Sequence, residues 1–136
     1  MNQAGTVSEA VALIKKAFEL FDQGGMAAAA ELLADDIEWQ TTGLISQGAT
    51  YRGMDDVLAY GRRFDGAFEG LHFKPLSFIE RGDCVIVPTK LSARGAHGGG
   101  KMEVILTYAC WVRDGKISRV RSFRSRDAAL KAISGP

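Results

Sequence analysis

The chain has 136 residues, of which 46% are hydrophobic and 24% charged, and its seventeen Lys and Arg residues nearly balance its sixteen Asp and Glu residues. A chain of this length typically forms one domain whose core needs neither metal nor disulfide, so we expect a single domain over residues 1–136. The charge balance argues against a nucleic-acid partner, which would require a clustered basic excess. No apolar run approaches the roughly 18 residues of a membrane-spanning helix, so we expect no membrane span.

The cysteines and histidines give no sign of a cofactor. Cys84 and Cys110 fall in apolar, strand-like runs without another ligand at metal-binding spacing. His72 and His97 also lack nearby partners of that kind. We therefore expect reduced, buried thiols, no metal and no cofactor. Residues 1–8 lack the basic and apolar segments of a secretory signal, so we expect a cytoplasmic location.

The N-terminal part of the chain is predicted to be helical. Thr6 can cap the first turn, with Glu9 reaching back to it. Apolar residues then recur at three- and four-residue spacing up to Phe21, which predicts an amphipathic helix that ends near Asp22. The glycines of Gln23-Gly24-Gly25 terminate this helix.

Four segments follow before the pattern changes. In chain order we predict a short alanine-rich helix over 26–34, a strand over 37–41, a loop over 43–51 and a helix that begins at Gly53. The apolar stripe of the last helix consists of Val57, Tyr60, Phe64 and Phe68. Asp65 lies off the centre of this stripe, so it reaches the interior only if its flank of the helix turns inward.

From Leu71 onward the apolar residues recur with a period of two. We predict four strands, separated by turns that contain glycine, over 71–80, 84–94, 102–112 and 117–124. Helices followed by a run of strands indicate an α+β fold with a mostly antiparallel sheet.

Four segments also carry a resemblance to a known family. They are Ala-Phe-Glu-Leu-Phe-Asp-Gln-Gly-Gly at 17–25, Leu-Leu-Ala-Asp-Asp-Ile-Glu-Trp at 32–39, Tyr-Arg-Gly at 51–53 and Trp-Val-Arg-Asp-Gly-Lys-Ile-Ser-Arg-Val-Arg-Ser-Phe at 111–123. In this order and spacing they resemble the SnoaL-like branch of the nuclear transport factor 2-like superfamily over nearly the whole chain. The resemblance implies a cone-shaped roll, in which a strongly curved sheet wraps around three N-terminal helices and encloses a pocket.

The resemblance also indicates which side chains face that pocket. Matching motifs of relatives place Thr41, Tyr108 and Ser122 on the inner face of the sheet. Because side chains alternate along a strand, the same face should carry Ile37, Trp39, Met102, Val104, Leu106, Cys110, Val120 and Arg124. The family commonly forms homodimers through the outer face, where we expect an apolar surface made of Ile105, Trp111 and Phe123.

Known catalytic patterns of the superfamily are not preserved. In the ketosteroid isomerase pattern, the donor tyrosine falls at Ala17, the base at Thr41 and the protonated acid at Tyr108. SnoaL-type polyketide cyclases place an aspartate at the Tyr108 position and a histidine at the Ser122 position. Limonene epoxide hydrolase has an aspartate at the Ser122 position. Any active site in this chain would therefore be new.

The remaining polar residues define our candidate site. Tyr108 and Arg124 can donate hydrogen bonds to a carbonyl or enolate oxygen, and Asp65 is the candidate proton acceptor. For ligand binding we expect Phe18, Trp39, Thr41, Tyr60, Phe64, Met102, Leu106, Cys110, Val120 and Ser122.

Three functions fit these residues. The first is a protein that binds a small apolar or aromatic molecule, with isomerase- or cyclase-type proton transfer on a carbonyl-bearing substrate. The second is a non-catalytic binding or carrier module. The third is a dimeric association domain whose vestigial pocket is filled by Trp39, Phe18 and Phe64.

Overall fold

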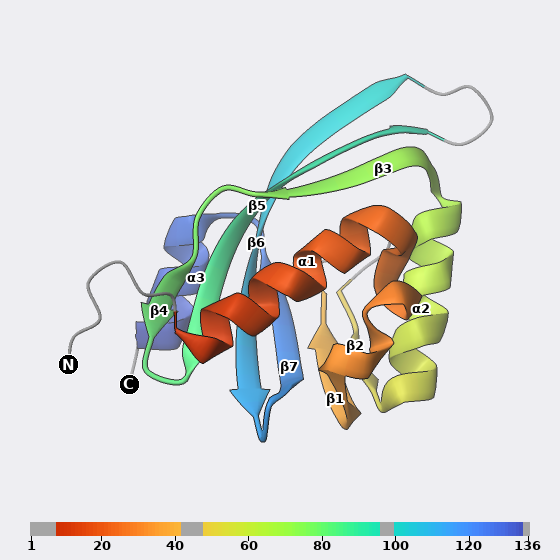
Figure 1. The fold of residues 1–136 in the computed structure, drawn as a ribbon. Coiled ribbons are helices and arrows are strands. Elements are labelled where there is room, and N and C mark those ends of the chain that lie inside the picture. The colour runs from red at the N-terminus through yellow and green to blue at the C-terminus, as the bar shows by residue number, and fades with distance from the viewer. Residues whose placement is uncertain (1–7, 42–47, 96–99, 135–136) are drawn as a thin grey trace.

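The computed structural model describes residues 8–41, 48–95 and 100–134. The elements in chain order are α1 (Glu9–Ala28), the 3-10 helix η1 (Ala30–Leu32), β1 (Leu33–Gln40), β2 (Thr50–Arg52), α2 (Met54–Gly66), β3 (Phe68–Pro75), β4 (Ile79–Arg81), β5 (Cys84–Gly95), β6 (Lys101–Arg113), β7 (Lys116–Phe123) and α3 (Arg126–Ser134). The expected α+β class is confirmed (Figure 1).

In the described part of the chain, the strands form one open sheet in the order β2-β1-β7-β6-β5-β3, with β4 paired to β5. All neighbours are antiparallel except β1 and β7, which run parallel. α2 contacts α1 and also β1 and β3, which lie toward opposite edges of the sheet. The sheet must therefore curl around α1, as Figure 1 shows, and this gives the cone its concave inner face.

The first helix differs from its prediction at both ends. Ser8 caps it, with its side-chain oxygen accepting a hydrogen bond from the Val11 amide at 3.1 Å. The predicted cap, Thr6, lies outside the described residues. The backbone leaves helical geometry at Gly24 and Gly25, where Gly25 has φ +77°, and a further helical turn follows up to Ala28.

The short helix predicted over 26–34 is corrected to this turn and η1. β1 begins at Leu33 rather than at residue 37, because Leu33 pairs with Ile117 of β7 and is buried. This pairing in the sheet outweighs the helix propensity of the alanine-rich stretch. Phe68, which we assigned to the helical stripe, is the first residue of β3.

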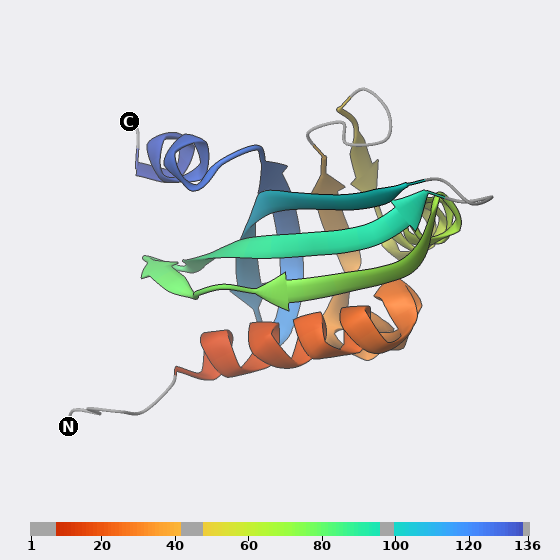
Figure 2. The same cartoon turned by 90° about the horizontal axis from the view of Figure 1, so that it is seen from above.

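Two elements were not predicted. β2 lies at the end of the expected loop and pairs with β1. α3 packs on the outer face of the sheet, opposite α1 (Figure 2). Its residues Ala129, Leu130 and Ile133 form a small apolar cluster with Ile86, Ala109 and Phe123 of the sheet. Only 8% of Phe123 is exposed, so its predicted place on an open dimer surface is wrong.

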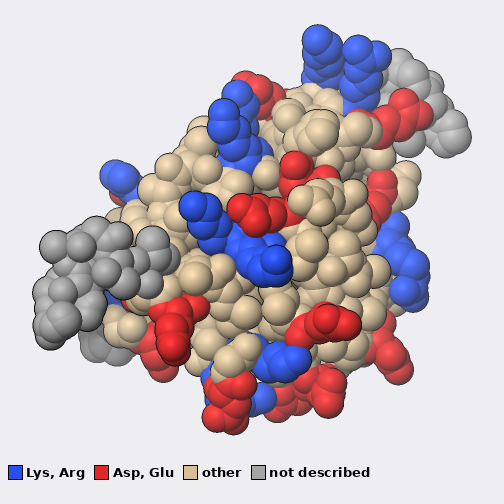
Figure 3. Space-filling view, in the orientation of Figure 1, with Lys and Arg blue, Asp and Glu red and all other residues tan. Residues whose placement is uncertain are grey.

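The outer surface carries both signs of charge. Figure 3 shows acidic and basic side chains interspersed over the face on which α1 lies. Several arginines of the sheet are ion-paired: Glu38 contacts Arg52 at 3.0 Å and Arg119 at 3.4 Å, and Asp36 contacts Arg113. None of the helices in the described ranges is long and apolar enough to cross a membrane.

Candidate functional site

One cavity opens between α1, α2 and the inner face of the sheet. About 550 Å³ of space, part of it open to solvent, lies between its walls, but only about 20 Å³ of this space admits the centre of a water molecule. The cavity is therefore narrow. Its lining consists of Phe18, Phe21, Met26, Trp39, Thr41, Tyr60, Gly61, Phe64, Asp65, Phe73, Leu106, Tyr108 and Ser122.

Local periodicity brings these side chains together. Alternation along β6 turns both Leu106 and Tyr108 inward, and Ser122 of β7 pairs opposite Tyr108. On α1, Phe18 and Phe21 are one turn apart and share the buried stripe. Tyr60 and Phe64 have the same relation on α2, so two helices and the sheet each contribute aromatic rings.

The rings pack against one another largely by their edges. The Tyr108 ring meets those of Phe18 and Trp39 with centroids 5.6 and 6.2 Å apart, both in T-shaped geometry. Phe21 lies 6.0 Å from Trp39 and 6.1 Å from Phe73. Edge-to-face contact is a geometry that aromatic side chains prefer, and the narrow space lies among these rings.

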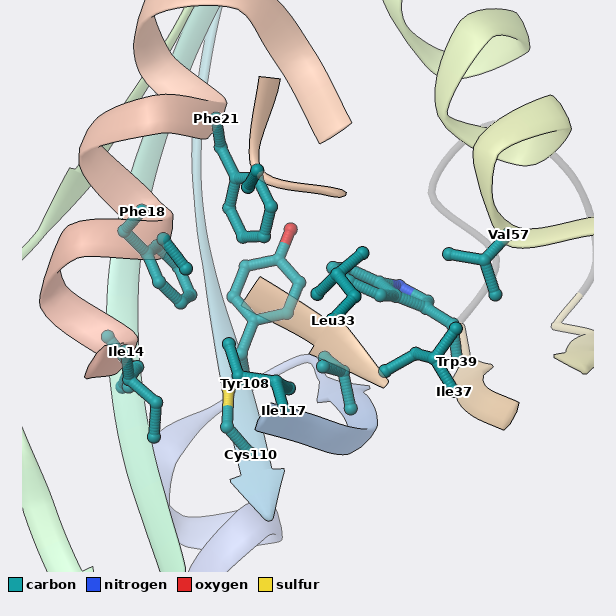
Figure 4. Close-up of a cluster of buried hydrophobic side chains, with 14 of the residues drawn as sticks. Ile14, Phe18, Phe21, Leu33, Ile37, Trp39, Val57, Tyr108, Cys110 and Ile117 are labelled. Atoms are coloured by element: carbon teal, nitrogen blue, oxygen red, sulfur yellow. The ribbon is translucent and has the colours of Figure 1, made fainter. Parts of the chain in front are cut away.

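Tyr108 places a phenol hydroxyl deep in the cavity. Figure 4 shows this hydroxyl pointing toward Phe21 and away from Cys110. No hydrogen bond joins it to another residue that the structure describes. Burial raises its pKa above the ordinary value, and the neighbouring Tyr60 raises it further. Burial also raises the pKa of Tyr60, with a smaller contribution from Tyr51. Both phenols are therefore neutral at pH 7 and can donate hydrogen bonds.

Asp65 is the single charged residue among the described residues that line the cavity. One side of its carboxylate lies so close to Gly25 that a Cβ at position 25 would overlap it. The rest of the side chain is exposed at the cavity mouth. Desolvation raises the pKa of this carboxyl. A similar close approach occurs one turn earlier on α2, where a Cβ on Gly61 would lie 2.9 Å from the Met26 sulfur.

Thr41 lines the cavity but has a structural task. Its hydroxyl accepts a hydrogen bond from the Ala49 amide at 3.1 Å and lies 3.4 Å from the Ala49 carbonyl oxygen. The Thr41 amide also donates to that carbonyl at 2.8 Å. These contacts hold together the two ends of the segment between β1 and β2.

The structure brings most of the predicted site residues together. Nine of them line the cavity: Phe18, Trp39, Thr41, Tyr60, Phe64, Asp65, Leu106, Tyr108 and Ser122. Cys110 and Val120 do face inward, but they are buried in the packed core beyond the cavity.

Two predicted residues lie away from the site. Met102 is half-buried near the beginning of β6, on a shallow surface groove, because this end of the strand extends beyond the cavity. Arg124 is exposed, and its predicted inward orientation is wrong because β7 ends at Phe123 and alternation no longer applies.

Four lining residues were not predicted. Phe21 could have been found, since it follows Phe18 by one turn on the same stripe, and Phe73 could have been found from its inward phase on β3. Met26 and Gly61 carry no signal of their own. Their position depends on the break in α1 at Gly25 and on its contact with α2.

The described residues contain no group of three or more His, Cys, Asp or Glu side chains that could hold a metal ion.

The model of the SnoaL-like domain family matches residues 14–120 of the chain. No curated protein matches it in sequence. Among solved structures, it is similar to a nuclear transport factor 2-like protein from Burkholderia pseudomallei, with 17% identity over 95% of this chain and 100% of the other and a TM-score of 0.76. A protein from Jannaschia sp. CCS1 described as a SnoaL-like polyketide cyclase has 17% identity, 100% and 99% coverage and a TM-score of 0.74.

A third solved structure is a protein with the ketosteroid isomerase-like fold from Catenulispora acidiphila, in complex with trimethylamine. It has 17% identity over 91% of this chain and 93% of the other, with a TM-score of 0.73. At this level of identity the likeness shows the fold alone.

Proposed function

The chain belongs to the SnoaL-like domain family, and from this premise we propose that it binds a small, mostly apolar molecule, aromatic or carbonyl-bearing, in the cavity next to Tyr108. The observation that carries the proposal is the described lining, in which six further aromatic rings share the cavity with the deeply buried phenol of Tyr108. Apolar pockets with a few convergent polar groups are typical ligand sites. The narrow space favours a small ligand, and a larger one requires the rings to turn.

The two phenols supply the polar part of recognition. Tyr108 and Tyr60 both line the cavity as neutral donors, so either can donate a hydrogen bond to a ligand oxygen. In an apolar surrounding such a donor also stabilises negative charge that develops on a carbonyl oxygen.

A second candidate function is proton transfer, and the observation that favours it is Asp65. This carboxylate lines the same cavity, and its raised pKa brings it closer to the range of an effective general base. Asp65 would take a proton from the carbon next to a carbonyl, while Tyr108 donates a hydrogen bond to the enolate oxygen. Where a carbon–carbon double bond adjoins the deprotonated carbon, return of the proton to the far end of the resulting dienolate moves that double bond and completes an isomerisation.

Binding can be measured through the cavity's own tryptophan. The chain has two tryptophans, and in a Trp111→Phe variant Trp39 is the only one. We expect a saturable change in its fluorescence on titration with 1-tetralone, a flat ketone. Tyr108→Phe should weaken this binding by about 2- to 10-fold, the effect of one hydrogen bond. No saturable change up to the solubility limit would contradict the proposal.

Proton transfer needs a separate readout. In D₂O, the protons next to the carbonyl of 1-tetralone should exchange faster with the protein than in buffer, as followed by proton NMR. Asp65→Asn should abolish the acceleration. Tyr108→Phe should reduce it strongly while the ketone still binds. If the wild-type protein binds the ketone but does not accelerate exchange, it acts on this ketone as a non-catalytic carrier.

We also propose that two copies associate through the part of the outer sheet face that α3 leaves open. Ile105 is 51% exposed there, and Trp111 is half-buried beneath the Arg119 guanidinium, 4.6 Å from its ring centroid. Sedimentation should show a dimer that Ile105→Lys dissociates. A dimer whose cavity binds neither aromatic nor charged probes would instead favour the association domain.

A further inference from the structure

The charge on the described lining of the cavity is of one sign. Among these residues Asp65 has the only charged side chain, and seven of the thirteen are aromatic. Aromatic faces carry a partial negative charge, so they attract cations as well as apolar groups. Walls of this kind favour a cation over an anion.

Two helix ends add to this negative charge. Asp65 lies in the last turn of α2, which ends at Gly66. The regular part of α1 ends at its break, and Gly25 at that break touches the Asp65 carboxylate. The carbonyl ends of helices carry about half a negative charge each. The partial negative charges of both helix ends therefore lie close to the full negative charge of the Asp65 carboxylate at the cavity mouth.

Basic residues nearby do not neutralise this arrangement. The four residues before the α1 break, Leu20-Phe21-Asp22-Gln23, include no lysine or arginine, and the last turn of α1 has none. Arg63 is in the last turn of α2, but its guanidinium lies over the Tyr51 ring, 5.5 Å from the centroid. Tyr51 in turn stacks on Tyr60, and the positive charge of Arg63 lowers the pKa of the Tyr60 phenol, whereas the cause of the shifted pKa of Asp65 is its burial.

We infer that the cavity binds a small alkylammonium cation, whose apolar alkyl groups contact the aromatic rings while Asp65 and the two helix ends balance its charge. The inference rests on the proposed function, because it uses the same cavity, and it specifies the charge of the ligand. In the empty cavity the carboxylate and the helix ends repel one another. A bound cation removes this repulsion, whereas a neutral ligand leaves it and an anion increases it.

The test compares two molecules of the same shape. Choline and 3,3-dimethylbutan-1-ol differ in that a quaternary nitrogen replaces a carbon, so they separate charge from size. In the Trp111→Phe background, Trp39 fluorescence should report choline binding at least tenfold tighter than binding of the neutral alcohol. Asp65→Asn should remove most of this difference, because it should weaken the binding of choline far more than the binding of the alcohol.

Asp56→Asn is the matched control. It removes the same charge from the same helix, but at the opposite end and away from the cavity. It should leave choline binding within twofold of the wild-type value. Equal affinity for choline and the alcohol, or equal effects of the two Asn variants, would overturn the inference.

The same measurements distinguish failure of the cation inference from failure of the proposed function. If 1-tetralone binds and choline does not, the cation inference is wrong while the binding proposal stands. If none of the three probes binds, both are wrong.

Discussion

The inner face of the sheet has two ends that are packed in different ways. At one end, Ile14, Cys110 and Ile117 are almost completely buried in contact with other core side chains. At the other end, Phe21 and Trp39 meet edge to face and leave a cavity. Figure 4 shows both ends around β6, with Cys110 below the Tyr108 ring, Phe21 above it, and Phe18 and Trp39 on either side.

The difference teaches how one strand can serve stability and binding together. Tyr108 and Cys110 are two residues apart, face the same side and belong to the same buried core, yet only Tyr108 lines the cavity. Flexible and branched aliphatic side chains interdigitate to high density. At the cavity end the rings contact one another in the edge-to-face geometry that aromatic side chains prefer, and the space of the cavity lies among them.

Ile14→Ala at the packed end should have the largest effect and tests the difference in packing most directly. Ile14 is fully buried, so the substitution removes its transfer free energy and leaves a void. We expect the free energy of unfolding to fall by about 2–5 kcal/mol, measured by urea denaturation. Phe64→Leu at the cavity end should cost less than about 1.5 kcal/mol, since its ring already borders empty space. Equal costs would show that the two ends do not differ in packing.

Gly25→Ala acts at the boundary between α1 and the cavity mouth. Position 25 has φ +77°, which disfavours any side chain, and the new Cβ would overlap the Asp65 carboxylate. We expect a loss of about 1–3 kcal/mol in the free energy of unfolding. Gly66→Ala is the control, because its Cβ would enter open space at the end of α2, and it should be neutral or stabilise by up to about 1 kcal/mol. Similar losses for the two variants would exclude the close approach as the cause.

Tyr108→Phe sharpens the comparison, because it separates binding from stability at one position. The hydroxyl has no hydrogen bond to another described residue, so its removal should change the free energy of unfolding by less than about 0.5 kcal/mol. Urea denaturation of the free protein gives the value. A loss above about 1 kcal/mol would indicate a structural role for the hydroxyl and would weaken its assignment to a ligand.

Asp65→Asn has the smallest expected effect, and at pH 7 it should raise rather than lower the free energy of unfolding. The raised pKa of Asp65 means that the folded protein holds this proton more tightly than the unfolded chain. The protonated carboxyl thus favours the fold below its ordinary pKa of 3.8, and this contribution is lost as the pH rises through the raised pKa.

Asp65→Asn should therefore match the wild type near pH 3 and be slightly more stable at pH 7, as thermal unfolding at both values would show. Asp56→Asn, at the beginning of α2, should instead lose a little stability at pH 7, because a carboxylate there is favourable to the helix dipole. If the wild-type protein were more stable than Asp65→Asn at pH 7, the predicted direction of the stability change would be wrong.

Side-chain periodicity was sufficient to predict part of the site. The spacing of Tyr60 and Phe64 placed them on the buried side of α2. On β6, the resemblance to relatives placed Tyr108 on the inner face, and alternation from Tyr108 placed Leu106 there. These relations are local, because they depend on the repeat of a helix or strand and not on the rest of the chain.

Other features depend on tertiary contacts and could not be predicted in this way. Alternation predicts which face of β6 carries Met102, but it does not predict how far the strand extends beyond the cavity. Leu33 adopts a strand only because β7 offers it a partner. α3 had a local signal, since Ala129, Leu130 and Ile133 recur at helical spacing, but the face that this helix covers is a property of the sheet.

The parallel pairing of β1 with β7 has a consequence for the order of folding. These strands join residues 33–40 to residues 117–121, so the contact between them closes a loop that includes most of the fold. Such distant contacts form slowly, because a large loss of chain entropy precedes them. A nascent chain can assemble α1 and α2 early, but β1 receives its second neighbour only after β7 has been synthesised. Until then the hydrophobic face of β1, including Trp39, needs protection from aggregation.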